Sequence, residues 1–407
     1  MSVRFFRILA VFSAVLIVAV FASAQSSRPR RVKQTQDPLL LPRPTPTPKP
    51  RNNNAPLLDV QPVKPVASAP APADTSHAFE LLQQKQFAAA AKEAKQIAAS
   101  DPQNSEAWKI AGFAELGLKQ YADASSDLQK ALDLQRAAKQ EDPHTADALA
   151  EAYIYSEKFD RALPLLVTAT TRAGAQPDPV SFYYRGLAEY KTGKIADAEK
   201  SFNAVVKLSP KDSLSLYYLG QIAVAKGDLD GAIAALNRAT VNDPRLPAAW
   251  TLLTSAYLRR AAAATDAAKS DADYLNAVRA GEGLIKVRTD ADAITLFGQA
   301  LIGAKQYARA ATALERATAG SDANEVAFYL LGVAHSRVKN FPKAIAALER
   351  AAEKKPDDVN VYRELGYAYE VTKQYAKALG AYQKGLNLVP NDTDLKESVE
   401  RMRPFAK

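Results

Sequence analysis

One stretch decides the fold: residues 214–244 read LSLYYLGQIAVAKGDLDGAIAALNRATVNDP. Apolar residues recur at helical spacing in Leu214–Lys226, and Gly227 follows where a helix needs a left-handed cap. The pattern repeats in Leu229–Ala239 and stops before Pro244, because proline cannot continue a helix and disfavours one just before it. We therefore expect two helices joined by a tight turn.

The same pair of helices recurs along the chain at an interval of 34 residues. Several columns keep this interval: Gly186 and Gly220; Gly298, Gly332 and Gly366; Ala310, Ala344 and Ala378; Pro356 and Pro390. A shared register across several residue types indicates a true repeat. Small residues such as Gly220 and Ala232 would let the two helices approach closely. Since one pair leaves apolar surface on both flanks, we expect each pair to stack on the next.

These columns resemble the signature of the tetratricopeptide repeat family, in which Leu-Gly and large residues mark the first helix and Ala and Pro the second. The signature is matched by Phe328, Leu331, Gly332, Phe341, Ala344, Leu348, Ala351 and Pro356, and by Tyr362, Leu365, Gly366, Tyr369, Tyr375, Ala378, Tyr382 and Pro390. The resemblance implies an all-α, right-handed α-solenoid over residues 74–392, closed by a capping helix and tail, residues 393–407. About nine units are expected, beginning near Asp74, Ser105, Pro143, Pro179, Ser213, Pro247, Ala291, Glu325 and Val359.

Two departures from the repeat carry specific expectations. The sixth unit is ten residues longer than the others, and the extra residues include the alanine run Ala261–Ala264, which has high helix propensity. We expect both helices of this unit to lengthen by about a turn and to project beyond their neighbours. In the fourth unit, Arg185 and Glu189 replace apolar residues at a spacing that allows them to pair.

The amino terminus has the pattern of a secretory signal peptide, residues 1–24. Arg4 and Arg7 precede an apolar run, Ile8–Phe21, and Ala22–Ala24 supplies a small-residue exit. The run is shorter than a membrane-spanning helix needs, so cleavage before Gln25 is favoured over retention as a membrane anchor. We expect no integral membrane span after cleavage. Export across the inner membrane, into a bacterial periplasm or cell envelope, is the expected location.

Residues 25–73 predict a disordered, basic, proline-rich linker. They hold 12 of the 24 prolines, no glycine and a net charge of +6. Proline removes backbone donors and fixes φ, so we expect an extended, partly polyproline-II spacer. With the signal peptide, the spacer accounts for +8 of the formal +9, and the repeats keep only +1. A nucleic-acid partner is therefore not expected, because a nucleic-acid binder carries its basic surface on the folded part.

No constellation of residues predicts catalysis, a cofactor site or a metal site. The chain has no cysteine, and its three histidines, His77, His144 and His335, lack the spacing of a metal or catalytic motif. His335 stands where other repeats have tyrosine, which favours a place in the core. Gly281-Glu282-Gly283 lacks the strand and the Lys-Ser/Thr of a nucleotide loop and is better interpreted as a weak point in a helix. We therefore expect a protein that is not an enzyme.

The function expected is that of a protein-interaction scaffold or adaptor of the cell envelope, with a protein or peptide partner in the concave groove. The alternative is an accessory of an export, pilus or polysaccharide-secretion machine. In the family, the exposed face of each first helix lines the groove, and the matching residues are Phe113, Tyr155, Tyr183, Leu187, Tyr190, Tyr217 and Gln221. The family's clamp for a peptide carboxylate is not matched, since Phe113 stands one turn beyond Lys109. Acidic peptide tails are thus not expected as ligands.

Overall fold

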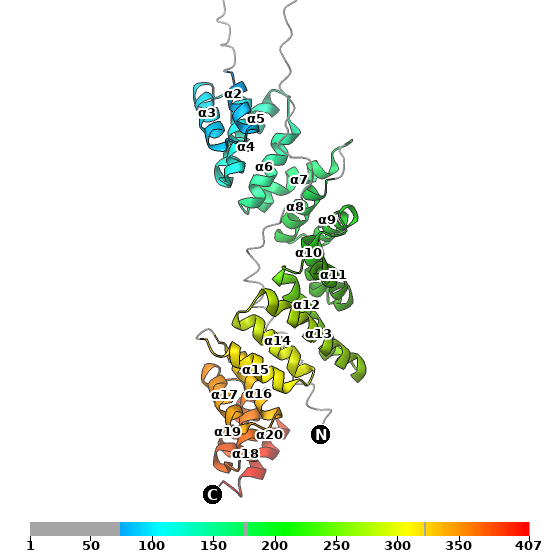
Figure 1. The fold of residues 1–407 in the computed structure, drawn as a ribbon, viewed down its shortest axis with the longest axis vertical. Coiled ribbons are helices and arrows are strands. Elements are labelled where there is room, and N and C mark those ends of the chain that lie inside the picture. The colour runs from blue at the N-terminus through cyan, green and yellow to red at the C-terminus, as the bar shows by residue number, and fades with distance from the viewer. Residues whose placement is uncertain (1–73, 175–177, 321–322, 407) are drawn as a thin grey trace, which may run out of the picture. The chain divides into compact units, whose positions relative to one another are not determined.

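Helices account for all the regular structure in the part of the chain that is described. The computed structural model describes residues 74–174, 178–320 and 323–406, which contain nineteen α-helices and no strand (Figure 1). The expected signal peptide and proline-rich linker lie outside the described residues. Two compact units contain the helices, and we call residues 74–208 the N-terminal unit and residues 209–406 the C-terminal unit.

The N-terminal unit contains four helix pairs. Its helices are α2 (Ser76–Gln83), α3 (Phe87–Ser100), α4 (Ser105–Leu118), α5 (Tyr121–Ala137), α6 (Pro143–Tyr155), α7 (Phe159–Thr171), α8 (Pro179–Lys191) and α9 (Ile195–Leu208). Each helix packs on the next along the chain, and each first helix also contacts the first helix of the following pair. This arrangement is that of a helical solenoid.

The C-terminal unit contains five helix pairs and a closing helix. Its helices are α10 (Ser213–Lys226), α11 (Leu229–Asn242), α12 (Pro247–Ala263), α13 (Ala267–Val287), α14 (Ala291–Gly303), α15 (Tyr307–Ala317), α16 (Glu325–Arg337), α17 (Phe341–Lys354), α18 (Val359–Val371), α19 (Tyr375–Leu388) and α20 (Thr393–Met402). The closing helix α20 buries Leu395, Val399 and Met402 and leaves polar residues outward. Apart from α2, the first helix of every pair in the two units begins at the residue expected from the sequence.

Local chemistry explains where the helices begin and end. The Asp178 carboxylate accepts hydrogen bonds from the backbone N–H groups of Val180 and Ser181, and so caps α8. Equivalent caps begin most first helices, because aspartate and asparagine satisfy donors that a helix start leaves open. Gly227 ends α10 with φ of 80°, the left-handed conformation that the sequence predicts.

Each signature glycine faces a large residue sixteen positions later, on the second helix of the same repeat. The pairs are Gly112 and Leu128, Gly186 and Phe202, Gly220 and Leu236, Gly298 and Leu314, Gly332 and Leu348, and Gly366 and Tyr382. A Cβ atom on Gly220 would lie 2.6 Å from Leu236 Cγ, closer than non-bonded carbons approach. The expected steric role of glycine at the helix contact is confirmed.

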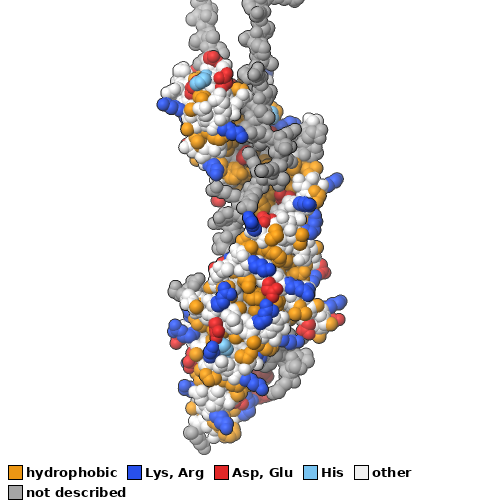
Figure 2. Space-filling view, in the orientation of Figure 1, with side chains coloured by type: hydrophobic (Ala, Val, Ile, Leu, Met, Phe, Trp, Pro, Cys, Tyr) orange, Lys and Arg blue, Asp and Glu red, His pale blue; other side chains and the backbone are white. Residues whose placement is uncertain are grey.

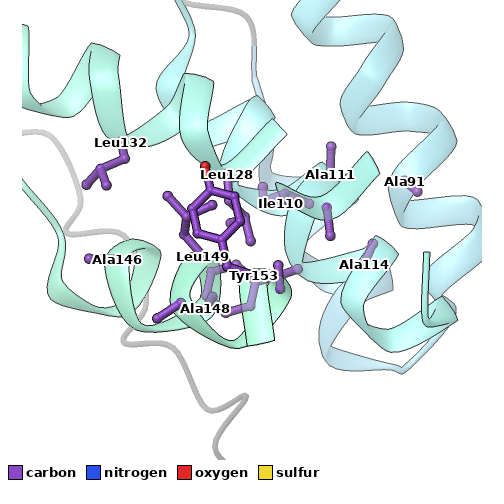
Figure 3. Packing of buried hydrophobic residues seen from close by; sticks show 14 of the residues in the cluster. Ala91, Ile110, Ala111, Ala114, Leu128, Leu132, Ala146, Ala148, Leu149 and Tyr153 are labelled. Atoms are coloured by element: carbon purple, nitrogen blue, oxygen red, sulfur yellow. The ribbon is translucent and has the colours of Figure 1, made fainter. Parts of the chain in front are cut away.

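The core of the N-terminal unit shows how successive helices interlock. Ile110 of α4, Leu128 and Leu132 of α5, and Leu149 and Tyr153 of α6 gather in one cluster of buried side chains (Figure 3). All five are at most 4% exposed. Each second helix therefore contributes to two layers, which is why a single helix pair could not bury its apolar residues.

The long sixth repeat forms the extended hairpin that the sequence predicts. Its helices α12 and α13 have 17 and 21 residues, whereas α10 and α11 have 14 each. Arg260 donates to both carboxylate oxygens of Asp273, at 2.8 and 2.6 Å, and so ties the two arms together. Beyond this ion pair, residues 265–269 at the tip are exposed.

Candidate partner-binding site

The seven residues expected to bind a partner divide between the two units. The N-terminal unit holds Phe113 on α4, Tyr155 on α6, and Tyr183, Leu187 and Tyr190 on α8, whereas the C-terminal unit holds Tyr217 and Gln221 on α10. The set thus does not form one site within a single unit, and its role in binding stays a prediction.

Three of the seven side chains are buried: Phe113 is 5%, Tyr183 7% and Tyr217 6% exposed. The Tyr183 ring lies 6.0 Å from the ring of Phe202 on the second helix of its own repeat. The Tyr217 hydroxyl accepts a hydrogen bond of 2.8 Å from Nε2 of Gln221. These contacts give the rings a structural role, and their substitution would lower stability as well as any binding.

Among the exposed large apolar residues of the N-terminal unit, which lie on α4, α7, α8 and α9, Val180 of α8 is the most exposed, and it lies near half-buried apolar residues of α6 and α8. Tyr155, Leu187 and Tyr190 are half-buried, and Val180 is 47% exposed. Val180 is seven residues before Leu187 and therefore shares its helix face. Val180 was not among the binding residues expected from the sequence, although its seven-residue spacing from Leu187 indicates it.

Three tyrosines from successive repeats extend this surface, and we call Tyr121, Tyr155 and Tyr184 the aromatic cluster. The Tyr121 and Tyr155 rings are stacked, with centroids 4.7 Å apart and planes at 18°. Tyr155 and Tyr184 meet edge to face at 6.1 Å, and their hydroxyls lie 2.9 Å apart. The cluster joins α5, α6 and α8 into a rigid, half-buried and amphipathic surface.

Two basic side chains near the first helices of this unit, Lys109 and Arg172, are paired with carboxylates. Lys109 is buried, and its Nζ lies 2.7 Å from Glu106 and 3.2 Å from Asp142. Arg172 pairs with Asp147 at 3.0 Å. Glu106 and Asp142 thus hold the ammonium of Lys109, whose side chain is only 10% exposed.

An ion cluster of two buried carboxylates and one exposed lysine crosses the first two repeats. Glu115 of α4 and Asp127 of α5 both contact the ammonium of Lys95 of α3, which lies 3.6 Å from Asp127. Burial raises the pKa of Glu115 to about 7, against the partial compensation of its hydrogen bond with Lys95. Burial also raises the pKa of Asp127, and the hydrogen bond with Glu115 raises the pKa of Lys95.

We expect Glu115→Gln to make the protein more stable above pH 7 and to leave it nearly unchanged below pH 5. The folded-state pKa of Glu115 exceeds its ordinary 4.5. Between pH 4.5 and about 7, the folded chain therefore holds on Glu115 a proton that the unfolded chain has lost. The stability from this group is full below pH 4.5 and is lost as the pH rises through about 7. Above pH 7 the buried charge costs about 1–3 kcal/mol, which glutamine avoids.

Urea unfolding at several pH values between 5 and 8.5 measures this effect. The exposed Glu80 of α2 provides a matched control, because Glu80→Gln removes the same charge from solvent. Parallel pH profiles for Glu115→Gln and the unaltered chain would show that the cluster stays ionised in the folded state.

The other paired and buried groups agree with the sequence analysis. Arg185 Nε donates to Glu189 Oε1 at 2.8 Å, which confirms the expected pairing, and the Ser201 hydroxyl donates to Glu189 Oε2 at 2.6 Å. His335 is 5% exposed, which confirms its place in the core, and burial lowers its pKa.

The described residues show no other chemical centre. Within residues 74–174, 178–320 and 323–406, no three His, Asp or Glu side chains are grouped so that they could hold a metal ion. No helix in the same ranges has both the length and the apolar character to cross a membrane. On the face drawn in Figure 2, basic and acidic side chains are interspersed among apolar ones over the described surface.

Known repeats match the chain at three places. The tetratricopeptide repeat family model matches residues 148–210, 183–247 and 329–393. With the paired helices and the glycine contacts described above, these matches show that residues 148–247 and 329–393 are built of tetratricopeptide repeats. Repeats of this kind define a class of protein, the helical scaffolds for protein–protein interaction. No curated protein gives a significant match to the sequence.

Several solved structures resemble this one in part. YrrB, described as a TPR protein with an unusual peptide-binding site, is 17% identical with a TM-score of 0.42, over 49% of this chain and 97% of that chain. MamA from Desulfovibrio magneticus RS-1 is 23% identical with a TM-score of 0.39, over 45% and 98%. The C-terminal part of a TPR repeat-containing protein from Cytophaga hutchinsonii is 14% identical with a TM-score of 0.41, over 80% and 99%. Nothing about ligands follows from these likenesses.

Proposed function

We propose that the chain is a non-enzymatic scaffold of the cell envelope, exported by residues 1–24, which binds a segment of a protein partner on α6 and α8 of the N-terminal unit. The observation that carries the proposal is the rigid apolar surface formed by Val180, Leu187 and the aromatic cluster. Rigid aromatic side chains bury a large area on binding at a low cost in conformational entropy.

Site-directed photocrosslinking in the native envelope tests this surface. A benzophenone side chain in place of Val180 is expected to give a crosslink to one partner, identified by mass spectrometry. The same group in place of Val241 provides a matched control, since Val241 is 78% exposed on α11 of the C-terminal unit. Equal capture from both positions, or none from Val180, would contradict the proposed site.

The identity of the captured partner separates two functions. A soluble or peripheral envelope protein is the result expected for a scaffold. A membrane-embedded subunit of a secretion apparatus would favour the alternative, an accessory of an export, pilus or polysaccharide-secretion machine.

A further inference from the structure

Lysine occupies a turn position in the C-terminal unit where the backbone favours glycine. The turns between the two helices of the last three repeats hold Lys305, Lys339 and Lys373, with φ of 61°, 63° and 61°. The fifth repeat has Gly227 at the same place, with φ of 80°. This left-handed conformation is less favourable for a residue with a Cβ atom than for glycine. Lysine at three successive turns, 34 residues apart, therefore indicates a role for the ammonium groups.

Two of these three ammonium groups are not paired with carboxylates. Lys305 lies 3.1 Å from Asp271 of α13. Lys339 and Lys373 are exposed, and neither forms an ion pair within residues 209–320 and 323–406. The carboxylate of Glu370, close to the second of these turns, is held by Arg401 of α20 at 2.9 Å. The turns of the last two repeats thus carry uncompensated positive charge.

Exposed apolar side chains lie beside the same two turns. Val338 directly precedes Lys339 and is 41% exposed, and Val371 at the end of α18 is 44% exposed. Tyr367 is 45% exposed and lies one turn before Val371 on the same face of α18. Phe405, which follows α20, is 59% exposed. Apolar and basic side chains are therefore exposed together at this end of the last two repeats.

Packing and ring contacts join these side chains into one edge. The first helices α16 and α18 contact each other, so the turns that follow them are neighbours (Figure 1). The Tyr367 ring meets the ring of Phe341, the first residue of α17, edge to face at 6.2 Å. The Phe405 ring lies 5.4 Å from that of Tyr375, the first residue of α19. The turn edge, as we call it, consists of Val338, Lys339, Phe341, Tyr367, Val371, Lys373, Tyr375 and Phe405.

The turn edge has the chemistry that suits the surface of an anionic bilayer. Lysine side chains are attracted by anionic headgroups. Aromatic rings, tyrosine above all, settle at the boundary between headgroups and acyl chains, and small apolar side chains beside them enter the same layer. A fluid bilayer adapts to a row of separate apolar side chains, so it needs no matching hollow in the protein.

We propose that the turn edge of the last two repeats docks the protein on the surface of an anionic membrane. The contact is separate from the proposed partner surface on α6 and α8, because all its residues belong to the C-terminal unit. Only a few side chains take part, and salt screens the attraction between exposed charges. We therefore expect reversible binding that weakens as the ionic strength rises.

The absence of cysteine from the chain lets a single introduced thiol report the contact. A polarity-sensitive fluorophore on Val371→Cys of the purified full-length chain is expected to shift to the blue on vesicles of phosphatidylglycerol and phosphatidylcholine in equal parts. Vesicles of phosphatidylcholine alone should leave it unchanged. The same label on Val241→Cys is the matched control, since Val241 is 78% exposed on α11 of the same unit. Equal shifts at both positions would overturn the proposal.

Charge reversal tests the two lysines. The double variant Lys339→Glu, Lys373→Glu should lower the vesicle partition coefficient, measured with the same label, at least tenfold. Glutamate fits this turn, because Glu157 occupies the equivalent place in the third repeat with φ of 59°. Lys354→Glu, Lys384→Glu makes the same charge change on the second helices α17 and α19 of the same repeats and should have a much smaller effect. Equal losses would reduce the effect to net charge and overturn the assignment.

Three further outcomes have definite meanings. Raising the salt concentration to about 0.5 M should reverse the shift of the Val371→Cys label, and a shift that persists would overturn the role of the lysines. Sedimentation with vesicles and no shift at this label would assign membrane binding to other residues. Polyglutamate is the probe for an acidic protein segment as the ligand, and a shift with polyglutamate but none with anionic vesicles would likewise overturn docking on a membrane.

Discussion

Replacement of Phe202 by alanine is expected to lower the free energy of unfolding by about 3–5 kcal/mol. Phe202 is 0% exposed on α9, and its ring fills the space beside Gly186 of α8, where a Cβ atom would lie 2.9 Å from Phe202 Cε1. It also contacts the ring of Tyr183. Glycine cannot close the gap that alanine would leave, so the substitution combines lost burial with a cavity.

Phe202→Leu is the matched control and should cost less than about 1.5 kcal/mol. Leucine fills the equivalent position opposite a signature glycine in Leu236, Leu314 and Leu348, so the repeat accommodates its shape. Urea unfolding gives the stabilities, and hydrogen exchange of α8 and α9 locates the loss. A similar cost for both substitutions, or a loss of protection spread evenly over both units, would contradict this account.

Gly366→Ala and Gly380→Ala should change stability in opposite directions, although the chemical change is the same. A Cβ atom on Gly366 of α18 would lie 2.3 Å from Cε1 of Tyr382. Tyr382 is 5% exposed, and its hydroxyl donates to Glu370 at 2.8 Å, so the ring cannot move away without breaking that contact. We expect a net loss of about 1–3 kcal/mol.

Gly380 lies on α19 of the same repeat, and nothing would stand within 4 Å of an added Cβ atom there. Alanine should stabilise this exposed helical position by up to about 1 kcal/mol, because glycine has more backbone freedom to lose on folding. Urea unfolding of both variants and of the unaltered chain measures these changes, as a lower midpoint for Gly366→Ala and a higher one for Gly380→Ala. A gain from both substitutions would mean that α18 and α19 can separate without cost.

Local periodicity made the helices predictable. The 34-residue register placed the first helices of eight repeats, and the alanine-rich insert predicted the long arms α12 and α13. The pairing of Arg185 with Glu189 was also accessible, because both residues lie on one helix. Each of these features depends on neighbours along the chain.

Features that depend on contacts between helices were not accessible in the same way. Periodicity gives the face on which Tyr183 lies, but not that the Phe202 ring would cover it. Glu115 is ionisable on an inward face, and its partner Lys95 comes from the preceding repeat, twenty residues away. Gly281 and Gly283 were expected to weaken α13, whereas a Cβ atom on Gly283 would lie 2.7 Å from the Trp250 ring. The repeat pattern predicted the close approach of helices at the signature glycines, but these particular contacts depend on how each helix packs on its neighbours.

The packing of each helix on its neighbours along the chain affects how the protein folds during synthesis and export. In each unit the main contacts of a helix are with helices one or two places away in the chain, so these contacts close short loops. The Ser156 hydroxyl, for example, donates to the Tyr121 carbonyl only 35 residues earlier. Chains with such low contact order fold rapidly. A chain that emerges amino terminus first, from a ribosome or through a membrane, can therefore begin to fold repeat by repeat, long before its last residue appears.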